Sequence, residues 1–320
     1  MRPSHVLAVD IGGTKLAAAL VDPEGRVTAQ DRVPTPNEPG VGGEELWQAL
    51  DALLAKLVAG AGDPPLAGVG VGCGGPMTWP AAEVSPLNIP AWRGFPLRER
   101  LRARHPGLPV RIHNDAICVA VGEHWRGAGR GHGNVLGMVV STGVGGGLIL
   151  DGRLVNGASG NAGHIGHVVV DPGGPPCACG GRGCLEAIAR GPGLVAWARE
   201  QGWRPDGRPG GSDATGVELA ADARRGDPVA GAAMRRAGRA LGIAIASATH
   251  LCDLEVVAIG GGLSQAGALL FDPLGEALRA HARMDFARRA RVVPAALGQT
   301  AGLVGAAALV HAQDRYWSAG

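Results

Sequence analysis

Apolar residues form short continuous runs near the start of the chain and again near its middle. Residues 6–22, VLAVDIGGTKLAAALVD, and residues 135–151, VLGMVVSTGVGGGLILD, each contain an apolar run, a polar and glycine-rich turn, and a second apolar run that ends at an aspartate. Runs of this length bounded by glycines are typical of buried strands, so each segment predicts two strands joined by a turn. Two similar segments, one in each half, predict a duplicated α/β domain with a cleft between the copies.

Further periodic segments add strands and helices to this pattern. Strands are predicted at residues 67–72, 109–113 and 255–259. Leucine, alanine and valine recur at three- and four-residue steps, which predicts helices at residues 44–58, 97–104, 115–126, 185–200 and 228–250. A last helix, at about residues 301–313, is so rich in alanine and glycine that we expect it to pack closely against another element.

Length, charge and cysteine usage narrow the class of protein. A chain of 320 residues is long enough for two lobes that each have a core. A formal net charge of +2 does not favour binding to nucleic acid or to a membrane surface. Asp10 interrupts the only early apolar run, so we expect neither a signal peptide nor a spanning helix. Cys73, Cys118 and Cys252 lie singly in apolar stretches, as buried thiols of a cytoplasmic protein would.

Residues 160–186, GNAGHIGHVVVDPGGPPCACGGRGCLE, hold a candidate metal site. His167, Cys177, Cys179 and Cys184 follow the spacing H-x9-C-x-C-x4-C among glycine turns. Three thiolates and one imidazole are the ligands that tetrahedral Zn²⁺ prefers, and four protein ligands indicate a structural ion. Three unrelated buried cysteines are the alternative, which the close spacing disfavours.

The turn of the first hairpin has the composition of a phosphate-binding loop. Gly12 and Gly13 allow backbone N–H groups to approach an anion, and Thr14 and Lys15 add a hydroxyl donor and a positive charge. Asp10 would repel phosphate unless Mg²⁺ lay between them, so its presence implies a metal–nucleotide complex. An ordinary tight hairpin is the alternative for this turn taken alone.

Two more glycine turns strengthen the prediction of a nucleotide site. One lies in the second hairpin, and the other follows the apolar strand that ends at Ile259. The residues expected to bind the nucleotide in these turns are Ser141, Thr142, Gly143, Gly260, Gly261 and Gly262. Each turn is a weak signal by itself, but three of them at strand ends favour ATP binding.

Asn114 and Asp115 stand between a predicted strand and a predicted helix. An aspartate at that position commonly caps the helix. A carboxylate near bound phosphate is also what is needed to take a proton from an attacking hydroxyl. Local sequence leaves both roles open.

These motifs together resemble the ROK family of bacterial sugar kinases and regulators. The similarity lies in the DIGGTK turn, the ND pair, the STGVGGG turn and the GHIGH…CxCGxxGCxE run, and it spans nearly the whole chain. It implies a two-lobed, actin-like ATPase fold in which sugar and ATP meet in a cleft. It places the N-terminal lobe at residues 1–115 plus 301–320 and the C-terminal lobe, with the zinc loop, at residues 116–300.

The resemblance also implies roles for individual residues. Asp115 is expected to be the base that deprotonates the sugar 6-hydroxyl. His167 would offer one ring nitrogen to zinc and the other to the sugar, so that the metal holds a sugar-binding loop. The residues expected to contact the sugar are Gly74, Gly75, Asn88, Asn114, Asp115, His164, His167 and Glu186. A homodimer or homotetramer is also implied.

His164 departs from the family pattern, which usually has Glu at the first position of E-x-G-H. Ionised Glu only accepts hydrogen bonds, whereas His can donate them, so the change indicates either an altered preference at the reducing end of the sugar or neutral drift. The GHIGH and DPxGPxCxCG segments are similar to N-acetylmannosamine kinases, whereas LNIPAWRGFPL is similar to glucokinases.

The sequence therefore predicts a Mg·ATP-dependent kinase acting on the 6-hydroxyl of glucose or a glucose-like amino sugar. N-acetylmannosamine and kanosamine stay open as substrates. A non-catalytic sugar sensor, or a ROK regulator without a DNA-binding module, is the alternative of another class. Only nine residues precede Asp10, too few for a helix-turn-helix, and the presence of Thr14 and Asp115 argues against a sensor.

Overall fold

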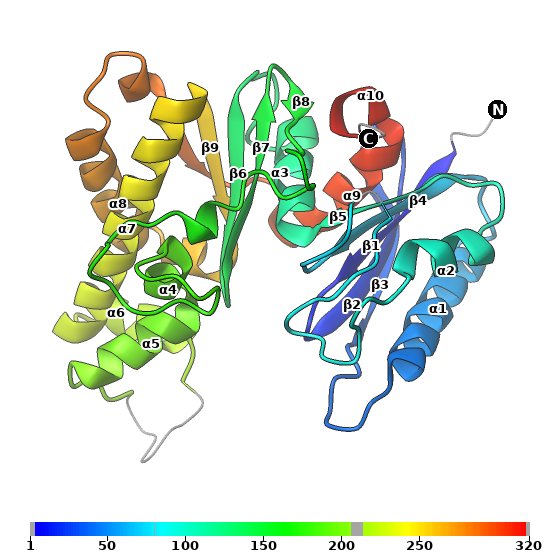
Figure 1. The fold of residues 1–320 in the computed structure, drawn as a ribbon, viewed down its shortest axis with the longest axis horizontal. Coiled ribbons are helices and arrows are strands. Elements are labelled where there is room, and N and C mark those ends of the chain that lie inside the picture. The colour runs from blue at the N-terminus through cyan, green and yellow to red at the C-terminus, as the bar shows by residue number, and fades with distance from the viewer. Residues whose placement is uncertain (1–3, 80, 206–213, 318–320) are drawn as a thin grey trace. The chain divides into compact units, whose positions relative to one another are not determined.

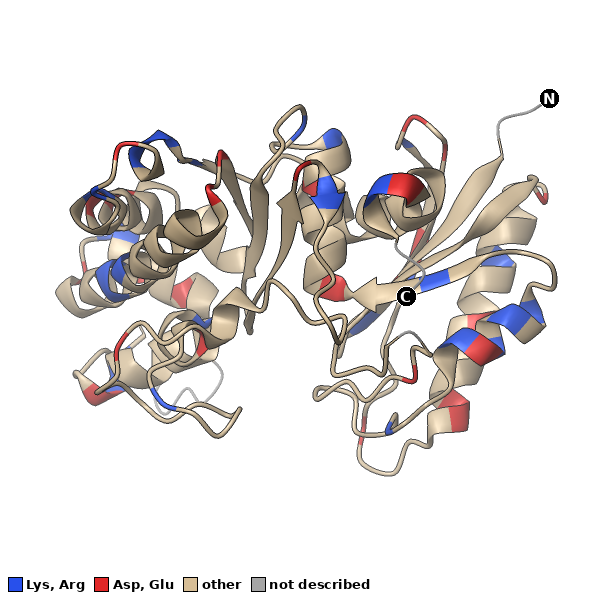
Figure 2. Cartoon of the chain, turned by 45° about the horizontal axis from the view of Figure 1, so that its top comes forward, with Lys and Arg blue, Asp and Glu red and all other residues tan. Residues whose placement is uncertain are grey.

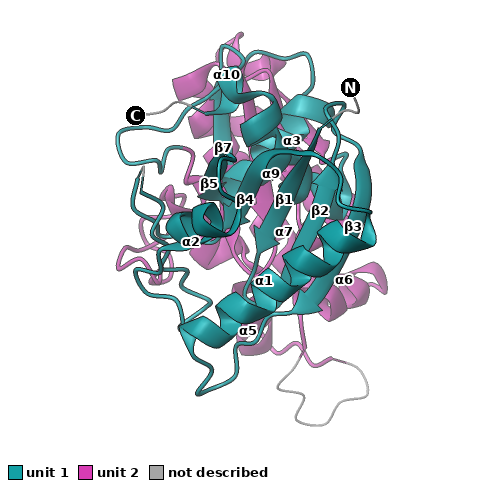
Figure 3. Ribbon diagram, turned by 90° about the vertical axis from the view of Figure 1, so that its right-hand side faces the viewer, with its two compact units in different colours: residues 1–133, 147–162, 296–320 teal, residues 134–146, 163–295 magenta. Residues whose placement is uncertain are grey.

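The computed structural model describes residues 4–79, 81–205 and 214–317. Its internal contacts divide the chain into two compact units (Figure 3). Unit 1 contains residues 1–133, 147–162 and 296–320, and unit 2 contains residues 134–146 and 163–295. This division differs from the predicted boundary at residue 115, because the helix that begins at Asp115 packs against the last long helix of unit 1.

Two five-stranded sheets form the framework (Figure 1). The first has the order β3-β2-β1-β4-β5, with β1 (His5–Ile11), β2 (Lys15–Val21), β3 (Val27–Pro34), β4 (Leu66–Cys73) and β5 (Val110–Asn114). The second has the order β8-β7-β6-β9-β10, with β6 (Val135–Val140), β7 (Val144–Leu150), β8 (Arg153–Leu154), β9 (Val256–Gly260) and β10 (Arg291–Pro294). In both sheets the first hairpin strand pairs in parallel with a later strand, which pairs in parallel with the next. The same order in both sheets confirms the predicted duplication.

Most predicted helices are present with nearly the predicted bounds. The helices are α1 (Gly43–Gly60), α2 (Leu97–Arg104), α3 (Asp115–Arg126), α4 (Leu185–Ala189), α5 (Gly191–Glu200), α6 (Gly216–Arg224), α7 (Pro228–Cys252), α8 (Ala268–His281), α9 (Ala301–His311) and α10 (Gln313–Tyr316). The single helix predicted at residues 185–200 was wrong. Arg190 is extended, with φ −68° and ψ 145°, and Pro192 lies in the first turn of α5. A proline is favoured in a first turn and disfavoured in a helix interior, so the chain breaks there.

Strand β4 shows how sequence alternation builds the two faces of the first sheet. Val69 and Val71 belong to the apolar core that includes the buried leucines of α1. The intervening glycines face the other side, where a Cβ on Gly68 would lie 2.9 Å from the Val310 side chain and one on Gly72 would lie 3.3 Å from Cys118 Sγ. Helices α9 and α3 can therefore approach the backbone of β4 closely, while α1 and α2 cover the opposite face (Figure 1).

Helix α9 packs against α3 through glycines on both sides. A Cβ on Gly305 would collide with the Cys118 carbonyl, and one on Gly122 would lie 3.0 Å from the Gly305 nitrogen. The expectation that the alanine- and glycine-rich helix packs closely against another element is thus confirmed. The contact also brings α9, the last long helix described, beside the helix that begins at Asp115.

Both acidic and basic residues occur along α1 and α2 (Figure 2). Arg100 pairs with Glu44 and Arg104 with Asp51, each at 2.7 Å, so the two helices are joined by ion pairs as well as by the core. Within residues 4–79, 81–205 and 214–317, no helix is both long and apolar enough to cross a membrane.

Candidate active site

The glycine turn of the first hairpin is held by polar side chains that follow β3. Thr35 Oγ1 donates to the Gly12 carbonyl at 2.6 Å. Asn37 Nδ2 donates to the Gly13 carbonyl at 3.2 Å and to the Asn88 carbonyl at 2.8 Å. Thr35 and Asn37 were not predicted, because neither belongs to a recognisable motif. Their only sequence signal is the polar segment that directly follows a strand, and their bonds tie the turn to the loop of Asn88.

The residues predicted for unit 1 converge at the carboxyl ends of β4 and β5, which pair in parallel. A Cβ on Gly74 would lie 3.4 Å from Asn88 Oδ1 and 4.0 Å from Asp115 Oδ2. A Cβ on Gly75 would lie 3.4 Å from Asn114 Nδ2. Five predicted positions that are up to 41 residues apart in the sequence therefore share one small region, where two glycines leave room beside three polar side chains.

The start of α3 bears on the two roles left open for Asp115, helix cap and proton acceptor. Asn114 is the N-cap, and its Oδ1 accepts a hydrogen bond from the Ala116 amide at 3.0 Å. Asp115 is the first helical residue, and its Oδ1 accepts from the same amide at 2.8 Å. Its Oδ2 faces the space beside Gly74. The cap is thus supplied mainly by the neighbouring residue, and one carboxylate oxygen of Asp115 points into the group of polar residues.

Asp10 lies on β1 in a region of low polarity. Burial, followed by the negative charge of Asp115, raises the pKa of Asp10 to about 6, and Lys15 partly offsets this increase. Burial and the same two carboxylates also raise the pKa values of the Cys73 and Cys118 thiols. Two acidic groups that disfavour each other's ionisation form the kind of environment that a cation would relieve.

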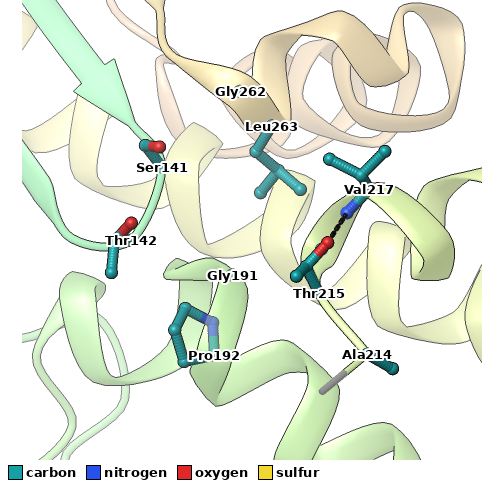
Figure 4. A pocket seen from close by; sticks show the side chains of 10 residues that line it. Ser141, Thr142, Gly191, Pro192, Ala214, Thr215, Val217, Gly262 and Leu263 are labelled. Atoms are coloured by element: carbon teal, nitrogen blue, oxygen red, sulfur yellow. Dashed lines mark hydrogen bonds between the residues drawn. The ribbon is translucent and has the colours of Figure 1, made fainter. Parts of the chain in front are cut away.

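Unit 2 holds a pocket of about 420 Å³ (Figure 4). Its lining residues are Ser141, Thr142, Gly191, Pro192, Ala214, Thr215, Gly216, Val217, Gly262 and Leu263. Three of the predicted nucleotide residues thus line one cavity. The rest of the lining was not predicted. Apart from Leu263, it comes from the starts of α5 and α6, where the only local signal is the capping box of Thr215 and Glu218.

Gly261 shapes this pocket without lining it. Its φ of +91° favours glycine, and a Cβ there would lie 2.8 Å from the backbone nitrogen of Val140. The close approach brings the third glycine turn against the end of β6, and a Cβ on Gly262 would lie only 3.7 Å from Ser141 Oγ. Gly143 accepts a hydrogen bond at its carbonyl from the Ser141 amide at 2.8 Å, which closes the second turn. Gly260 is the last residue of β9, beside Ala295.

Glu186 connects the second glycine turn to the cysteine-rich segment. Its Oε2 accepts a hydrogen bond from the Val144 amide at 2.9 Å, and the same oxygen would lie 2.9 Å from a Cβ on Gly143. Glu186 stands in the first turn of α4, directly after Cys184 and Leu185. A carboxylate there both suits the positive end of the helix dipole and holds the turn in place.

The candidate metal ligands form one cluster. One ligand atom from each of His167, Cys177, Cys179 and Cys184 lies within 4.8 Å of all the others. The Cys179 and Cys184 sulfurs are 3.8 Å apart, and His167 Nδ1 is 3.8 Å from Cys177 Sγ. Tetrahedral Zn²⁺ with Zn–S bonds of about 2.3 Å requires sulfurs about 3.8 Å apart, so these residues fit that ion.

The thiols of the cluster ionise unequally without a metal. Burial and the neighbouring cysteines raise the pKa of Cys184 to about 12, whereas a backbone hydrogen bond from Gly181 lowers the pKa of Cys179. A bound cation would displace the proton of Cys184.

His164 is the N-cap residue of a short 3-10 turn, Ile165–His167, and His167 is its last residue. Both side chains are exposed, and their rings are nearly parallel, with centroids 6.4 Å apart. Since Nδ1 of His167 faces the cysteines, its Nε2 is the nitrogen directed elsewhere. This arrangement is the one expected if His167 serves both zinc and a sugar.

A duplicated α/β fold with two matching five-stranded sheets and a glycine turn at the tip of each first hairpin defines the class of the actin-like ATPases. Within that class, residues 6–313 match the ROK family, and the chain belongs to this family.

Relatives of two activities are similar to the chain at comparable levels. A glucokinase of Streptomyces coelicolor is 36% identical over 96% of this chain and 98% of its own length. An N-acetylmannosamine kinase of Shigella flexneri is 37% identical over 83% of this chain and 85% of its own. A ROK family glucokinase of Streptomyces griseus, solved in complex with glucose and AMPPNP, has a TM-score of 0.81 and 36% identity, covering 97% of this chain and 100% of its own.

Proposed function

We infer that this chain is a sugar kinase of the glucokinase type that transfers the γ-phosphoryl group of ATP to a hexose. The observation that carries the inference is the convergence of Asp115 Oδ2, Asn88 and Asn114 around Gly74 and Gly75. Glucokinase relatives that match nearly the whole chain support the same activity. The acceptor proposed is the 6-hydroxyl of the sugar.

Asp115 is proposed as the catalytic base. The hydroxyl of the sugar loses its proton to Asp115 Oδ2 as its oxygen attacks the γ-phosphorus, and the bond from phosphorus to the bridging oxygen of ADP breaks. Oδ1 of Asp115 is held by the Ala116 amide, which orients the carboxylate and leaves Oδ2 directed at the sugar. Asn88, Asn114 and the backbone at Gly74 and Gly75 are proposed to position the hexose in unit 1.

The nucleotide is proposed to bind through the glycine turns. In unit 2 the base and ribose would occupy the pocket beside Gly262, against Pro192 and Leu263, with Gly260 and Gly261 giving the close backbone approach. Ser141, Thr142 and Gly143 would donate to phosphate oxygens there. In unit 1 the turn of Gly12, Gly13, Thr14 and Lys15 is proposed to bind phosphate as well.

The carboxylate of Asp10 is the kind of ligand that a magnesium ion takes. The pKa of this buried carboxyl is raised, and a nearby cation would favour its ionised form. Asp10 would hold the ion. When bound, Mg²⁺ neutralises charge on the phosphates of ATP.

The cluster of His167 and the three cysteines is proposed to hold a structural Zn²⁺. Four protein ligands leave no position open for chemistry, so the metal would act by fixing the segment that carries His164, His167 and Glu186. These three residues are proposed to contact the sugar in unit 2. Glu186 also braces the second glycine turn, which would make sugar and nucleotide binding depend on the same metal-held segment.

Glucose or a glucose-like amino sugar is the proposed substrate, with N-acetylmannosamine and kanosamine as the alternatives. His164 stands where most family members have Glu, and its ring can donate a hydrogen bond that a carboxylate cannot. The residue is therefore proposed to set the preference at the reducing end. A cytoplasmic location and a homodimer or homotetramer are also proposed.

The test is ADP release from Mg·ATP across glucose, N-acetylmannosamine, N-acetylglucosamine, mannose, glucosamine and kanosamine. One sugar should be clearly preferred, and Asp115→Asn should lower kcat by about 10²- to 10⁴-fold, as loss of a general base does, while sugar affinity changes little.

The matched control is Asp227→Asn, because Asp227 also accepts backbone hydrogen bonds at a helix N-terminus, at 2.9 Å from Val229 and 2.8 Å from Ala230. Since Asn is an equally good cap, this control should turn over like the wild type. Near-normal turnover of Asp115→Asn would remove Asp115 from the role of base. No turnover with any sugar, in a folded and metal-loaded protein, would favour a sugar sensor.

A further inference from the structure

His113 is a buried histidine next to the Asn114–Asp115 pair that the proposed mechanism does not use. It lies on β5, opposite Gly72 of β4, and its exposed fraction is 0%. Val110 and Ile112 on the same strand belong to the hydrophobic core that contains the leucines of α1. Because successive side chains of a strand point to opposite faces, His113 points to the other face of the sheet. Its sequence position gave no reason to single it out.

Both ring nitrogens of His113 have defined partners. The Asn114 amide donates to Nδ1 at 2.9 Å. A backbone N–H is only a donor, so Nδ1 carries a lone pair and no proton. The neutral ring must then carry its proton on Nε2, which lies 2.8 Å from Asn156 Oδ1 and donates to it. The two contacts together select one tautomer.

The ring is also held by aromatic packing. Trp79 lies against it, with centroids 5.2 Å apart, and Trp79 in turn contacts Trp317 at 5.1 Å. Trp79 belongs to the loop that follows Gly74 and Gly75, so the packing joins this loop, β5 and the end of the chain. A ring fixed by two hydrogen bonds and an aromatic face is a rigid support for whatever it bonds.

What His113 supports is the backbone at the start of α3. Its Nδ1 holds the amide of Asn114, and Asn114 both caps the helix and precedes Asp115. A rotation of that peptide would move the Asp115 carboxylate relative to Gly74 and Asn88. We propose that His113, in its Nε2-protonated tautomer set by Asn156, is a positioning residue that fixes the Asn114–Asp115 turn for phosphoryl transfer.

This proposal rests on the proposed function for its kinetic effect but not for its tautomer. His113→Leu removes the acceptor and should lower kcat by about 10- to 100-fold, as a base displaced by a fraction of an ångström does, with the KM for ATP nearly unchanged. His113→Asn places an oxygen near the position of Nδ1 and should recover most of the loss. Asn156→Ala keeps the acceptor and should lower kcat less than His113→Leu.

The matched control is His124→Leu. His124 is likewise buried in unit 1. Its two ring nitrogens lie 2.7 Å from the Tyr316 hydroxyl and 2.8 Å from the His132 carbonyl. It differs in lying on α3 about two turns beyond Asp115. It should lose thermal stability without a comparable loss of kcat. If His124→Leu and His113→Leu lowered kcat equally, the effect would be structural and the proposal would be overturned.

The tautomer is read directly from the ¹⁵N chemical shifts of the wild-type imidazoles, with the His113 signals assigned from the His113→Asn spectrum. An unprotonated Nδ1 and a protonated Nε2 are expected, in the protein without sugar or ATP. A proton on Nδ1 would overturn the proposal even if His113→Leu did not fold. A wild type that phosphorylates no sugar but shows the expected tautomer would count against the proposed function and leave the positioning of Asn114 intact.

Discussion

Asp10 and Asp115 show how a side chain proposed to act in the site can lower the free energy of unfolding of the protein. The carboxyl of Asp10 is buried near a second carboxyl, and its pKa is raised to about 6. At neutral pH the group is therefore ionised in an environment that favours the protonated form. Lys15 offsets only part of this effect, and further stabilisation of the charge would come with ligands, as is common where residues are selected for activity.

We expect Asp10→Asn to stabilise the ligand-free protein at neutral and alkaline pH. The folded state binds the Asp10 proton more tightly than the unfolded chain, whose pKa is 3.8, so wild-type stability from this group is complete below that value and is lost as pH rises through about 6. A shift of this size corresponds to about 3 kcal/mol. Urea unfolding in metal-free buffer from pH 4 to pH 8 measures the difference in the free energy of unfolding between the variant and the wild type. The variant should be more stable only near pH 8.

Asp115→Asn serves as the companion variant for this measurement. Removing the second negative charge lowers the pKa of Asp10, so the loss of wild-type stability should move to lower pH. A gain from Asp10→Asn that was equal at pH 4 and pH 8 would contradict the assignment of the effect to ionisation. Kinase activity of Asp10→Asn should fall despite the added stability.

The residues of the candidate site also differ in whether a sequence motif predicts them. Asp115 and the four candidate zinc ligands stand in motifs whose spacing reflects a local geometry, so they were predicted from the chain alone. Thr35, Asn37 and His113 have no such signature. Each acts through hydrogen bonds to segments that the sequence does not place beside it, apart from the bond of His113 to its own neighbour.

Among the elements, the segment from His164 to α4 connects the most functions. It carries the candidate metal cluster, the two neighbouring histidines and Glu186, whose carboxylate accepts from the Val144 amide in the second glycine turn. Helix α4 begins immediately after Cys184, so the candidate ligand and the carboxylate are separated by a single residue. If the cluster binds a metal as proposed, losing that metal should therefore affect both positions.

Cys179→Ser is expected to release zinc, raise the KM for the sugar and lower the melting temperature together. The Cys179 and Cys184 sulfurs are 3.8 Å apart rather than at a covalent distance, so no disulfide joins these two residues in place of the metal. Metal content by mass spectrometry, KM and thermal unfolding are the measurements. Cys252→Ser, which alters a partly buried thiol outside the cluster, should leave all three unchanged. Unaltered sugar affinity in zinc-free protein would contradict the proposal that zinc holds the sugar-binding loop in place.

The elements also show where periodicity fails as a guide. The pattern at residues 185–200 is continuous in apolar positions but the chain forms α4 and α5, since Pro192 starts a new helix. Helix α8 was not predicted, and it contains Pro273 among its apolar residues. In that helix the proline is tolerated because packing against α7 compensates for the hydrogen bond that it removes.

The molecule as a whole is a duplication whose parts are joined by several chain crossings. The last crossing, from residue 295 to residue 296, is held on the unit 1 side by Glu123 of α3. This carboxylate has an exposed fraction of 0% and accepts from the amides of Ala128 at 2.9 Å, Ala296 at 2.9 Å and Leu297 at 2.8 Å. Three backbone donors thus depend on one buried side chain.

Glu123→Leu should lower the free energy of unfolding by about 1 to 3 kcal/mol, because three backbone amides lose a charged acceptor, although they belong to residues that are partly exposed to water. Glu123→Gln keeps one oxygen and should lose less. Urea unfolding of both variants at pH 7 tests this. A loss below about 1 kcal/mol for Glu123→Leu would mean that the amides find other acceptors.

Local sequence was sufficient for the strands of the two hairpins, for β4, β5 and β9, for α1, α2, α3, α7 and α9, and for the glycine turns and the candidate metal ligands. Each of these depends on residues within one or two turns of chain, where the two-residue period of a strand, the 3.6-residue period of a helix or a short ligand spacing leaves a direct pattern. The duplication could be predicted for the same reason, since it repeats such a pattern.

Only the tertiary structure decided which distant segments meet. The bonds from Asn37 to Asn88 and from Glu123 to Leu297 join residues 51 and 174 positions apart, and much of the wall of the candidate nucleotide pocket comes from the starts of two helices. A hydrogen bond of this kind depends on the direction in which whole elements pack, and packing direction leaves no periodic trace in the residues that happen to face each other.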